Sequence, residues 1–298
     1  MIHFFAMISN MLTISTVLAR GLAAETEMCG RYDKLIGKSL PYTFASNQWG
    51  DDGSGSQCIK IANDETTFSA TWIWSNNSHL VHSFPNIKLD SNLLPLQLSS
   101  LSSLKIKASW AMAPASSSKS LEAIDAAANV MIDLFLDSNP VSANSTTLPK
   151  YEIMIWLADF GGKKPIGFSS SIKNPPRYKL RNNTFTLYSG NNSNGQYVYG
   201  WLASTNITDF DEDISPLLHY LWRHKLIDDS NYLGIVQFGS EAFHAKAEVV
   251  FSAQDYKLSI AGGTPSPEPS GDVSAASLCT PDISLGIIGA VVPLLAVI

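Results

Sequence analysis

The chain of 298 residues has few charged side chains and no cluster of positive ones. Asp, Glu, Lys and Arg make up 15% of its residues, whereas soluble globular proteins usually contain about 25%. The formal net charge is −6 and the sequence pI is about 5.5. A face that binds nucleic acid needs clustered Lys and Arg, so we expect no nucleic-acid partner.

The sequence also lacks the motifs that hold phosphates, metals or an activated serine. No Gly-rich phosphate loop follows a predicted strand, and no Gly-x-Ser-x-Gly elbow occurs. The six histidines lack the spacing of a metal site, and His79 and His82, three residues apart, fit a surface loop better. We therefore expect a protein that works without a metal or a cofactor.

The N-terminus carries little charge and begins with a mostly apolar segment, residues 2–18. Gly21-Leu22-Ala23 provides a small-x-small cleavage site after Ala23. This pattern predicts a signal peptide at residues 1–23. His3 is the only basic side chain before Arg20, which is few for such a signal, and a buried helix is the alternative.

The C-terminus is again poor in charge. Residues 262–276 contain much Gly, Pro and Ser and predict a linker, while residues 285–298 are apolar but too few to span a bilayer comfortably. Small residues around Ser274, a spacer and a terminal apolar run are typical of a GPI-attachment signal, in which residues 277–298 are removed. A hydrophobic hairpin or a disordered end is the alternative. We predict a secreted protein that contacts the membrane solely through a lipid anchor at Ser274.

Three cysteines are few, and an odd number, for a secreted chain. Cys279 would be removed with the tail, which leaves Cys29 and Cys58 to form a disulfide between the N-terminal strand and the body. Five sequons agree with the secretory route and predict glycosylation at Asn76, Asn144, Asn182, Asn191 and Asn206.

Residues 24–261 read as many short strands separated by Gly, Asn, Ser and Pro turns. We predict strands at 67–74, 105–112, 129–136, 151–157, 183–189, 196–203, 232–238 and 245–253. One segment has helical spacing: Ser215 can cap it, Pro216 suits its first turn, and its apolar stripe consists of Leu217, Leu218, Leu221 and Trp222. Many strands and one helix predict an all-β domain, a two-sheet jelly-roll sandwich with the helix on the outer face.

Three acidic residues lie on predicted strands that are otherwise apolar. In residues 151–157, alternation places Glu152 on one face with Met154 and Trp156, opposite the isoleucines. In residues 235–243, alternation places Glu241 on the same face as Gln237 and Gly239, away from the core. Asp133 lies on the non-core face of residues 129–136. The three acids are therefore expected to line one concave sheet.

Each acid alone fits a hydrogen-bonded structural carboxylate, and Glu152 also fits an exposed position on an edge strand. Together, in a secreted β protein rich in Trp, they favour cleavage of a glycosidic bond, which needs one carboxylate and one carboxylic acid. Flat side chains that can stack on sugar rings are available at Trp49, Trp72, Trp74, Trp110, Trp156 and Trp201.

Two of these segments carry a resemblance to a known family. Residues 151–158 (YEIMIWLA) resemble the nucleophile strand of glycoside hydrolase family 12, which contains endo-β-1,4-glucanases and xyloglucanases, and residues 237–243 (QFGSEAF) resemble its acid/base strand. Residues 129–135 resemble the strand whose Asp supports the nucleophile. Shorter matches occur in the family's order at Cys29, 47–50, 55–58, 72–74 and 164–167. The resemblance covers residues 29–261.

The resemblance implies a jelly roll with a long open cleft and a retaining double displacement. Glu152 would be the nucleophile and Glu241 the acid/base, while Asp133 would hydrogen-bond Glu152. Retention requires the two reacting carboxyls to lie about 5–5.5 Å apart. Substrate-binding residues are expected at Asn47, Trp49, Trp74, Met154, Trp156, Pro165 and Trp201.

The sequence departs from the family in a few places. Ala242 follows Glu241 where the family usually has Pro, and residues 116–125 and 168–176 look like unfamiliar loops. We predict a monomeric endo-β-1,4-glucanase whose partner is a cellulose-type β-glucan or xyloglucan. The alternatives are a carbohydrate-binding or cell-wall protein without turnover, and a wall-remodelling transglycosylase.

Overall fold

The computed structural model describes residues 25–116 and 118–267. The predicted signal peptide (1–23), most of the predicted linker, Ser274 and the predicted C-terminal tail lie outside these residues. None of the described helices combines the length and the apolar character that crossing a membrane would require.

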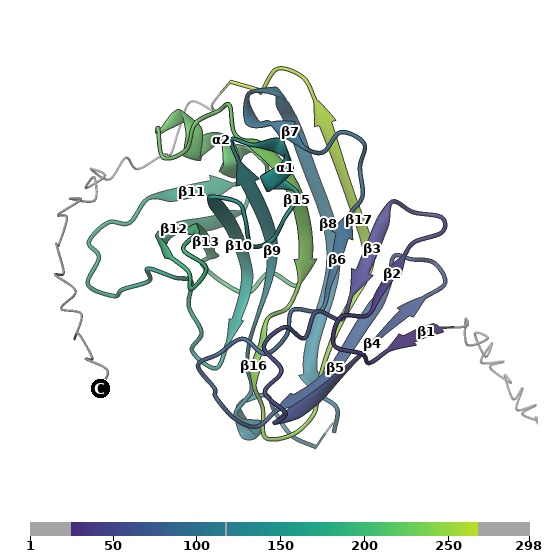
Figure 1. Ribbon diagram of the computed structural model, residues 1–298. Coiled ribbons are helices and arrows are strands. Elements are labelled where there is room, and N and C mark those ends of the chain that lie inside the picture. Colours follow the sequence, from purple (N-terminus) through teal and green to yellow (C-terminus); the bar gives the residue numbers. More distant parts are fainter. Residues whose placement is uncertain (1–24, 117, 268–298) are drawn as a thin grey trace, which may run out of the picture.

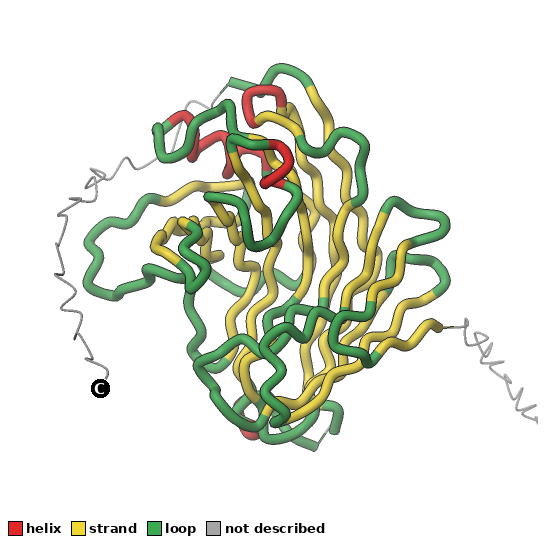
Figure 2. Tube along the Cα trace, viewed as in Figure 1, coloured by secondary structure: helices red, strands yellow, loops and turns green. Residues whose placement is uncertain are grey.

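Strands are the main regular element of the described chain, and they form two sheets that curve together (Figures 1 and 2). The smaller sheet has the order β1 (Glu25–Met28), β4 (Gly55–Ala62), β5 (Phe68–Trp74), β17 (Val249–Gly262), β8 (Leu101–Pro114) and β14 (Asp209–Asp213). The larger sheet has the order β11 (Arg177–Leu180), β12 (Asn183–Asn191), β13 (Tyr197–Ala203), β10 (Tyr151–Phe160), β9 (Ala127–Asp137), β15 (Tyr232–Gly239), β6 (Asn86–Leu89), β3 (Tyr42–Ala45) and β2 (Lys34–Ile36). Two short strands extend it, with β16 (Ala242–His244) paired to β9 and β7 (Leu96–Gln97) paired to β15.

The main hydrophobic core lies between the two sheets. Alternation along β10 sends Ile153 and Ile155 into this core. Aromatic rings make contact across the layers: Phe44 of β3 packs edge-on against Phe68 of β5, with ring centroids 5.9 Å apart. The two-sheet sandwich and its all-β class are confirmed, and the face of β10 that points away from the core is free to carry other side chains.

The predicted strands all exist, and three of their starts differ most from the prediction. The strand predicted from residue 105 begins at Leu101. The strand predicted from residue 245 begins at Val249, because residues 245–248 form a turn after β16. The strand predicted from residue 129 begins at Ala127. Short strands such as β2, β7 and β16 were not predicted, because two or three residues are too few to show a clear alternation.

The predicted helix forms α2 (Ser215–Arg223) and packs Leu217, Leu218 and Leu221 into the main core. Its predicted cap is wrong. The Ser215 side chain does not cap the helix, and the Asp213 carboxylate accepts the Ser215 backbone N–H at 3.0 Å instead. Sequence reasoning also missed α1 (Pro140–Ala143) and the single-turn 3₁₀ segments η1 (Leu98–Ser100) and η2 (Glu122–Ile124).

Candidate active site

The face of β10 opposite the core lines a cleft with a volume of about 830 Å³. Glu152, Met154 and Trp156 all contribute to this cleft, as alternation predicted. Met154 and Trp156 join Met131 of β9 and Val198 of β13 in a small apolar cluster on the same face. Glu152, at the start of this face, therefore lies next to apolar side chains of the cleft.

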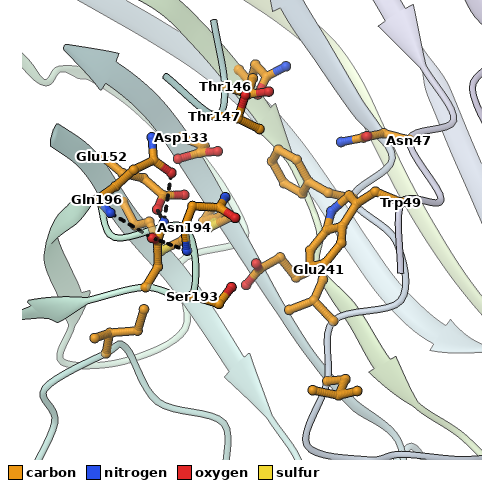
Figure 3. Close-up of a pocket in the computed structure, with 18 of the residues that line it drawn as sticks. Asn47, Trp49, Asp133, Thr146, Thr147, Glu152, Ser193, Asn194, Gln196 and Glu241 are labelled. Carbon is orange, nitrogen blue, oxygen red and sulfur yellow. Dashed lines mark hydrogen bonds between the residues drawn. The ribbon is translucent and has the colours of Figure 1, made fainter. Parts of the chain in front are cut away.

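Asp133 and Glu241 line the same cleft (Figure 3). Asp133 lies on β9 directly opposite Met154, one diagonal position from Glu152. Glu241 lies in the break between β15 and β16, so it does not continue the strand as predicted. Glu152, Asp133 and Glu241 are 7%, 4% and 9% exposed, respectively. Three nearly buried acids thus face one space.

Asn129, at the start of β9, holds Glu241 in place. Its side-chain carbonyl accepts the backbone N–H of Glu241 at 2.9 Å, and its amide donates to the Glu241 carboxyl. The backbone N–H of Asn129 also donates to the Glu241 carbonyl at 3.1 Å. This set of bonds gives Glu241 a defined position although it lies between two strands.

Glu152 is held from the other side by the turn between β12 and β13. The Asn192 amide donates to Glu152 Oε2 at 2.8 Å and to the Gln196 side chain at 2.8 Å. Gln196 in turn donates to the carbonyl of Pro149 at 3.1 Å, just before β10. Sequence reasoning missed Asn129, Asn192 and Gln196 as site residues, since a polar residue in a turn or beside a strand end has many ordinary roles.

The expected hydrogen bond between Asp133 and Glu152 does not form in this structure. Asp133 Oδ1 has no hydrogen-bond partner among the described residues. The two groups interact through charge instead: burial, followed by the charges of Glu152 and Glu241, raises the pKa of Asp133 well above its usual range.

Burial also separates the two glutamates in acidity. It raises the pKa of Glu152 to about 7, against the hydrogen bond from Asn192, which favours the carboxylate. Burial and then the charge of Glu152 raise the pKa of Glu241 to about 8, against the hydrogen bond from Asn129. At neutral pH the proton is therefore held more firmly by Glu241 than by Glu152. One acid and one base in a single cleft can perform general acid–base and nucleophilic chemistry.

Comparison with known proteins identifies this arrangement. The model of the family "Glycosyl hydrolase family 12" matches residues 40–261. The chain belongs to glycosyl hydrolase family 12. It is accordingly a glycoside hydrolase.

Individual relatives agree with this membership in glycosyl hydrolase family 12. The chain is 34% identical over 253 residues to a probable xyloglucan-specific endo-β-1,4-glucanase A of Aspergillus flavus, covering 83% of this chain and 96% of that protein. It is 33% identical over 252 residues to the xyloglucan-specific endo-β-1,4-glucanase A of Emericella nidulans, with coverage of 83% and 96%. Endoglucanase 3 of Trichoderma harzianum is a solved structure with 28% identity and a TM-score of 0.68, covering 80% of this chain and 98% of that one.

Several predicted substrate-binding residues of this family 12 hydrolase line the cleft, and others do not. Asn47 and Trp49 line it, and the Trp49 side chain is half exposed. The prediction that Trp201 binds substrate is wrong. Trp201 pairs with Ile155 across β13 and β10 and therefore faces the core, where it is fully buried.

The predictions that Trp74 and Pro165 bind substrate are also wrong. Trp74 ends β5 in the smaller sheet, where its buried ring stacks on His82 at 5.2 Å and donates to Ser83 at 3.1 Å. Pro165 does not line the cleft, because it packs over Gly200, where an added Cβ would meet the proline Cβ at 2.7 Å. Lys163, Lys164 and Ile166, on either side of it in the sequence, line the cleft instead.

The Cys29–Cys58 disulfide is present and joins the segment after β1 to β4. The asparagines of all five sequons are exposed to solvent. Asn191 is distinctive among them because it also lines the cleft, one residue before Asn192. Glycosylation at these positions stays a prediction.

Proposed function

We propose that this glycoside hydrolase is an endo-β-1,4-glucanase that cleaves xyloglucan or cellulose-type β-glucan by a retaining double displacement. The observation that carries the proposal is the pair of buried glutamates in one cleft, with the higher pKa at Glu241. The xyloglucan preference is supported by the printed names of the relatives from Aspergillus flavus and Emericella nidulans.

In the first step the Glu152 carboxylate attacks the anomeric carbon. The bond from that carbon to the glycosidic oxygen breaks while Glu241 gives its proton to the oxygen, and the leaving chain departs with a new hydroxyl. The Asn192 amide favours the ionised form of Glu152 that makes the attack. The higher pKa of Glu241 keeps its proton available at neutral pH.

In the second step the glycosyl–enzyme ester is hydrolysed. Glu241, now a carboxylate, takes a proton from water, whose oxygen attacks the anomeric carbon and releases Glu152. Burial favours the return of the proton to Glu241, and Asn129 keeps its carboxyl in place throughout. Asp133 lies diagonally across from Glu152 on β9, where burial and the charges of the two glutamates raise its pKa and favour its neutral form.

Reducing-end release from xyloglucan, soluble β-glucan and xylan tests this proposal. We expect the wild type to act on xyloglucan or β-glucan, and Glu152→Ala to lose activity by several orders of magnitude, with the exposed Glu248→Ala as the matched control. Proton NMR of fresh products distinguishes retention from inversion. A wild type that binds glucan without releasing reducing ends would make the protein a carbohydrate-binding module. Products longer than the substrate at high acceptor concentration would identify a transglycosylase.

We further propose that the enzyme is a secreted, glycosylated monomer held at the cell surface by a GPI anchor at Ser274. The exposed sequons and the disulfide support passage through an oxidising compartment. Treatment of membranes with a phosphatidylinositol-specific phospholipase tests the anchor, because an anchored protein moves to the soluble fraction. Retention in the membrane pellet would contradict the proposal.

A further inference from the structure

Lys163 is an unusual side chain in the cleft because it is half-buried and has no carboxylate partner among the described residues. It belongs to the loop between β10 and β11, residues 161–176. The next residue, Lys164, has a different environment, since its ammonium forms an ion pair with Asp159 at 2.8 Å. No carboxylate among the described residues pairs with this ammonium, so another interaction must account for its place in the cleft.

The ammonium of Lys163 connects three segments that line the cleft. It donates to the main-chain carbonyl of Ser78, in the loop between β5 and β6, and it lies over the ring of Phe243 at 4.5 Å from the centroid. Phe243 comes two residues after Glu241, and both line the cleft. Lys163 is therefore next to the wall that carries the proposed acid/base residue.

The Lys163 ammonium has N–H groups left to donate to a ligand. A lysine ammonium has three N–H groups, and one of them is bonded to Ser78. The Phe243 ring attracts the positive charge through its π face without forming an ordinary hydrogen bond. Burial lowers the pKa of Lys163, because the ammonium has lost part of its contact with water. A donor is thus available to a ligand in the cleft.

We propose that Lys163 binds a hydroxyl of the sugar unit on the leaving side of the scissile bond. This inference rests on the proposed function, because Glu241 protonates the oxygen of the leaving chain and Lys163 lies beside the wall that follows Glu241. The Ser78 carbonyl and the Phe243 ring hold the ammonium in a fixed place, so that little side-chain entropy is lost when the sugar binds.

Kinetics with two kinds of substrate test the proposal. Xyloglucan places a sugar on the leaving side, whereas a nitrophenyl β-cellooligoside places a phenol there. We expect Lys163→Met to raise KM for xyloglucan about fivefold to tenfold, as for the loss of one charge-assisted hydrogen bond. The same variant should change kcat/KM for the nitrophenyl substrate less than about twofold, and Lys163→Arg should recover part of the xyloglucan affinity. Lys246→Met is the matched control, since this exposed lysine pairs with Asp125 and does not line the cleft.

Each other outcome has a clear meaning. Equal losses of Lys163→Met on both substrates would overturn the inference and leave Lys163 as a brace between loops. Unchanged kinetics on both substrates would overturn it as well. A wild type inactive on both substrates would refute the proposed function, and the inference with it.

Discussion

Replacing Glu241 by Gln should make the protein more stable at neutral pH, although it removes the proposed acid/base group. Glu241 is nearly buried, and burial raises its pKa to about 8 from its usual 4.5. In the unfolded chain the group is ionised at neutral pH, whereas in the folded protein it must hold a proton or remain charged without water. A Gln side chain has the same shape, needs no proton and keeps an oxygen for the Asn129 amide.

The size of the effect follows from linkage. Because the folded pKa is raised, the contribution of Glu241 to stability is fully present below its unfolded pKa and is lost as the pH rises toward the folded pKa. Between the usual pKa of 4.5 and about pH 7, the interval of about 2.5 pH units costs about 3.5 kcal/mol at ~1.4 kcal/mol per unit. For a domain of this size, about 3.5 kcal/mol corresponds to about 7–14 °C in Tm. At about pH 4 the cost, and hence the gain from Gln, should be close to zero.

Scanning calorimetry of the wild type and Glu241→Gln at both pH values measures this gain. The exposed Glu248→Gln serves as the control and should leave Tm unchanged at either pH. A Tm for Glu241→Gln equal to or below that of the wild type at neutral pH would refute the reasoning, because a buried carboxyl with a raised pKa must oppose folding there. An equal gain at both pH values would point to a cause other than ionisation.

Three further substitutions test other parts of the site. Asn192→Ala should raise the pKa of Glu152 and move the acidic limb of the kcat/KM profile to higher pH; an unmoved limb would show that the hydrogen bond does not set this pKa. Trp49→Ala should raise KM for the glucan about fivefold, equivalent to about 1 kcal/mol, with no change in Tm, whereas a fall in Tm would indicate a structural role for this half-exposed ring. Gly200→Ala should lower the free energy of unfolding by about 1–3 kcal/mol in urea titrations, because the new Cβ meets Pro165 at 2.7 Å, and an unchanged midpoint would show that the loop can shift freely.

Alternation along single strands was sufficient to predict much of the site. It placed Glu152, Met154 and Trp156 on one face of β10, and all three line the cleft. The same two-residue period cannot tell which face of a sheet is concave, nor to which sheet a strand belongs. Trp74 and Trp201 were therefore predicted to face the substrate, although one lies in the smaller sheet and the other faces the core.

Contacts between residues far apart in the chain could not be predicted from the sequence, because they depend on how the strands come together. The place of Pro165 depends on the absence of a side chain at Gly200, 35 positions further along the chain (200 minus 165). The hydrogen bond from Asn192 to Glu152 spans 40 positions, and that from Asn129 to Glu241 spans 112. No local period relates such pairs, so the acids could be predicted and their partners could not.

Burial and the neighbouring charge, more than these amide partners, separate the roles of the two glutamates. Glu152 and Glu241 have the same side chain and similar burial, but Glu241 is buried beside the charge of Glu152 and therefore keeps its proton to a higher pH. Asp133 lacks a partner for Oδ1 among the described residues, and burial together with the charges of both glutamates raises its pKa well above the usual range. A single carboxylate consequently forms first at Glu152, where an amide donor from the β12–β13 turn is ready for it. Two identical side chains thus acquire different acidities, because burial raises both pKa values, the charge of Glu152 raises that of Glu241 further, and the amides of Asn192 and Asn129 oppose these shifts at their own glutamates.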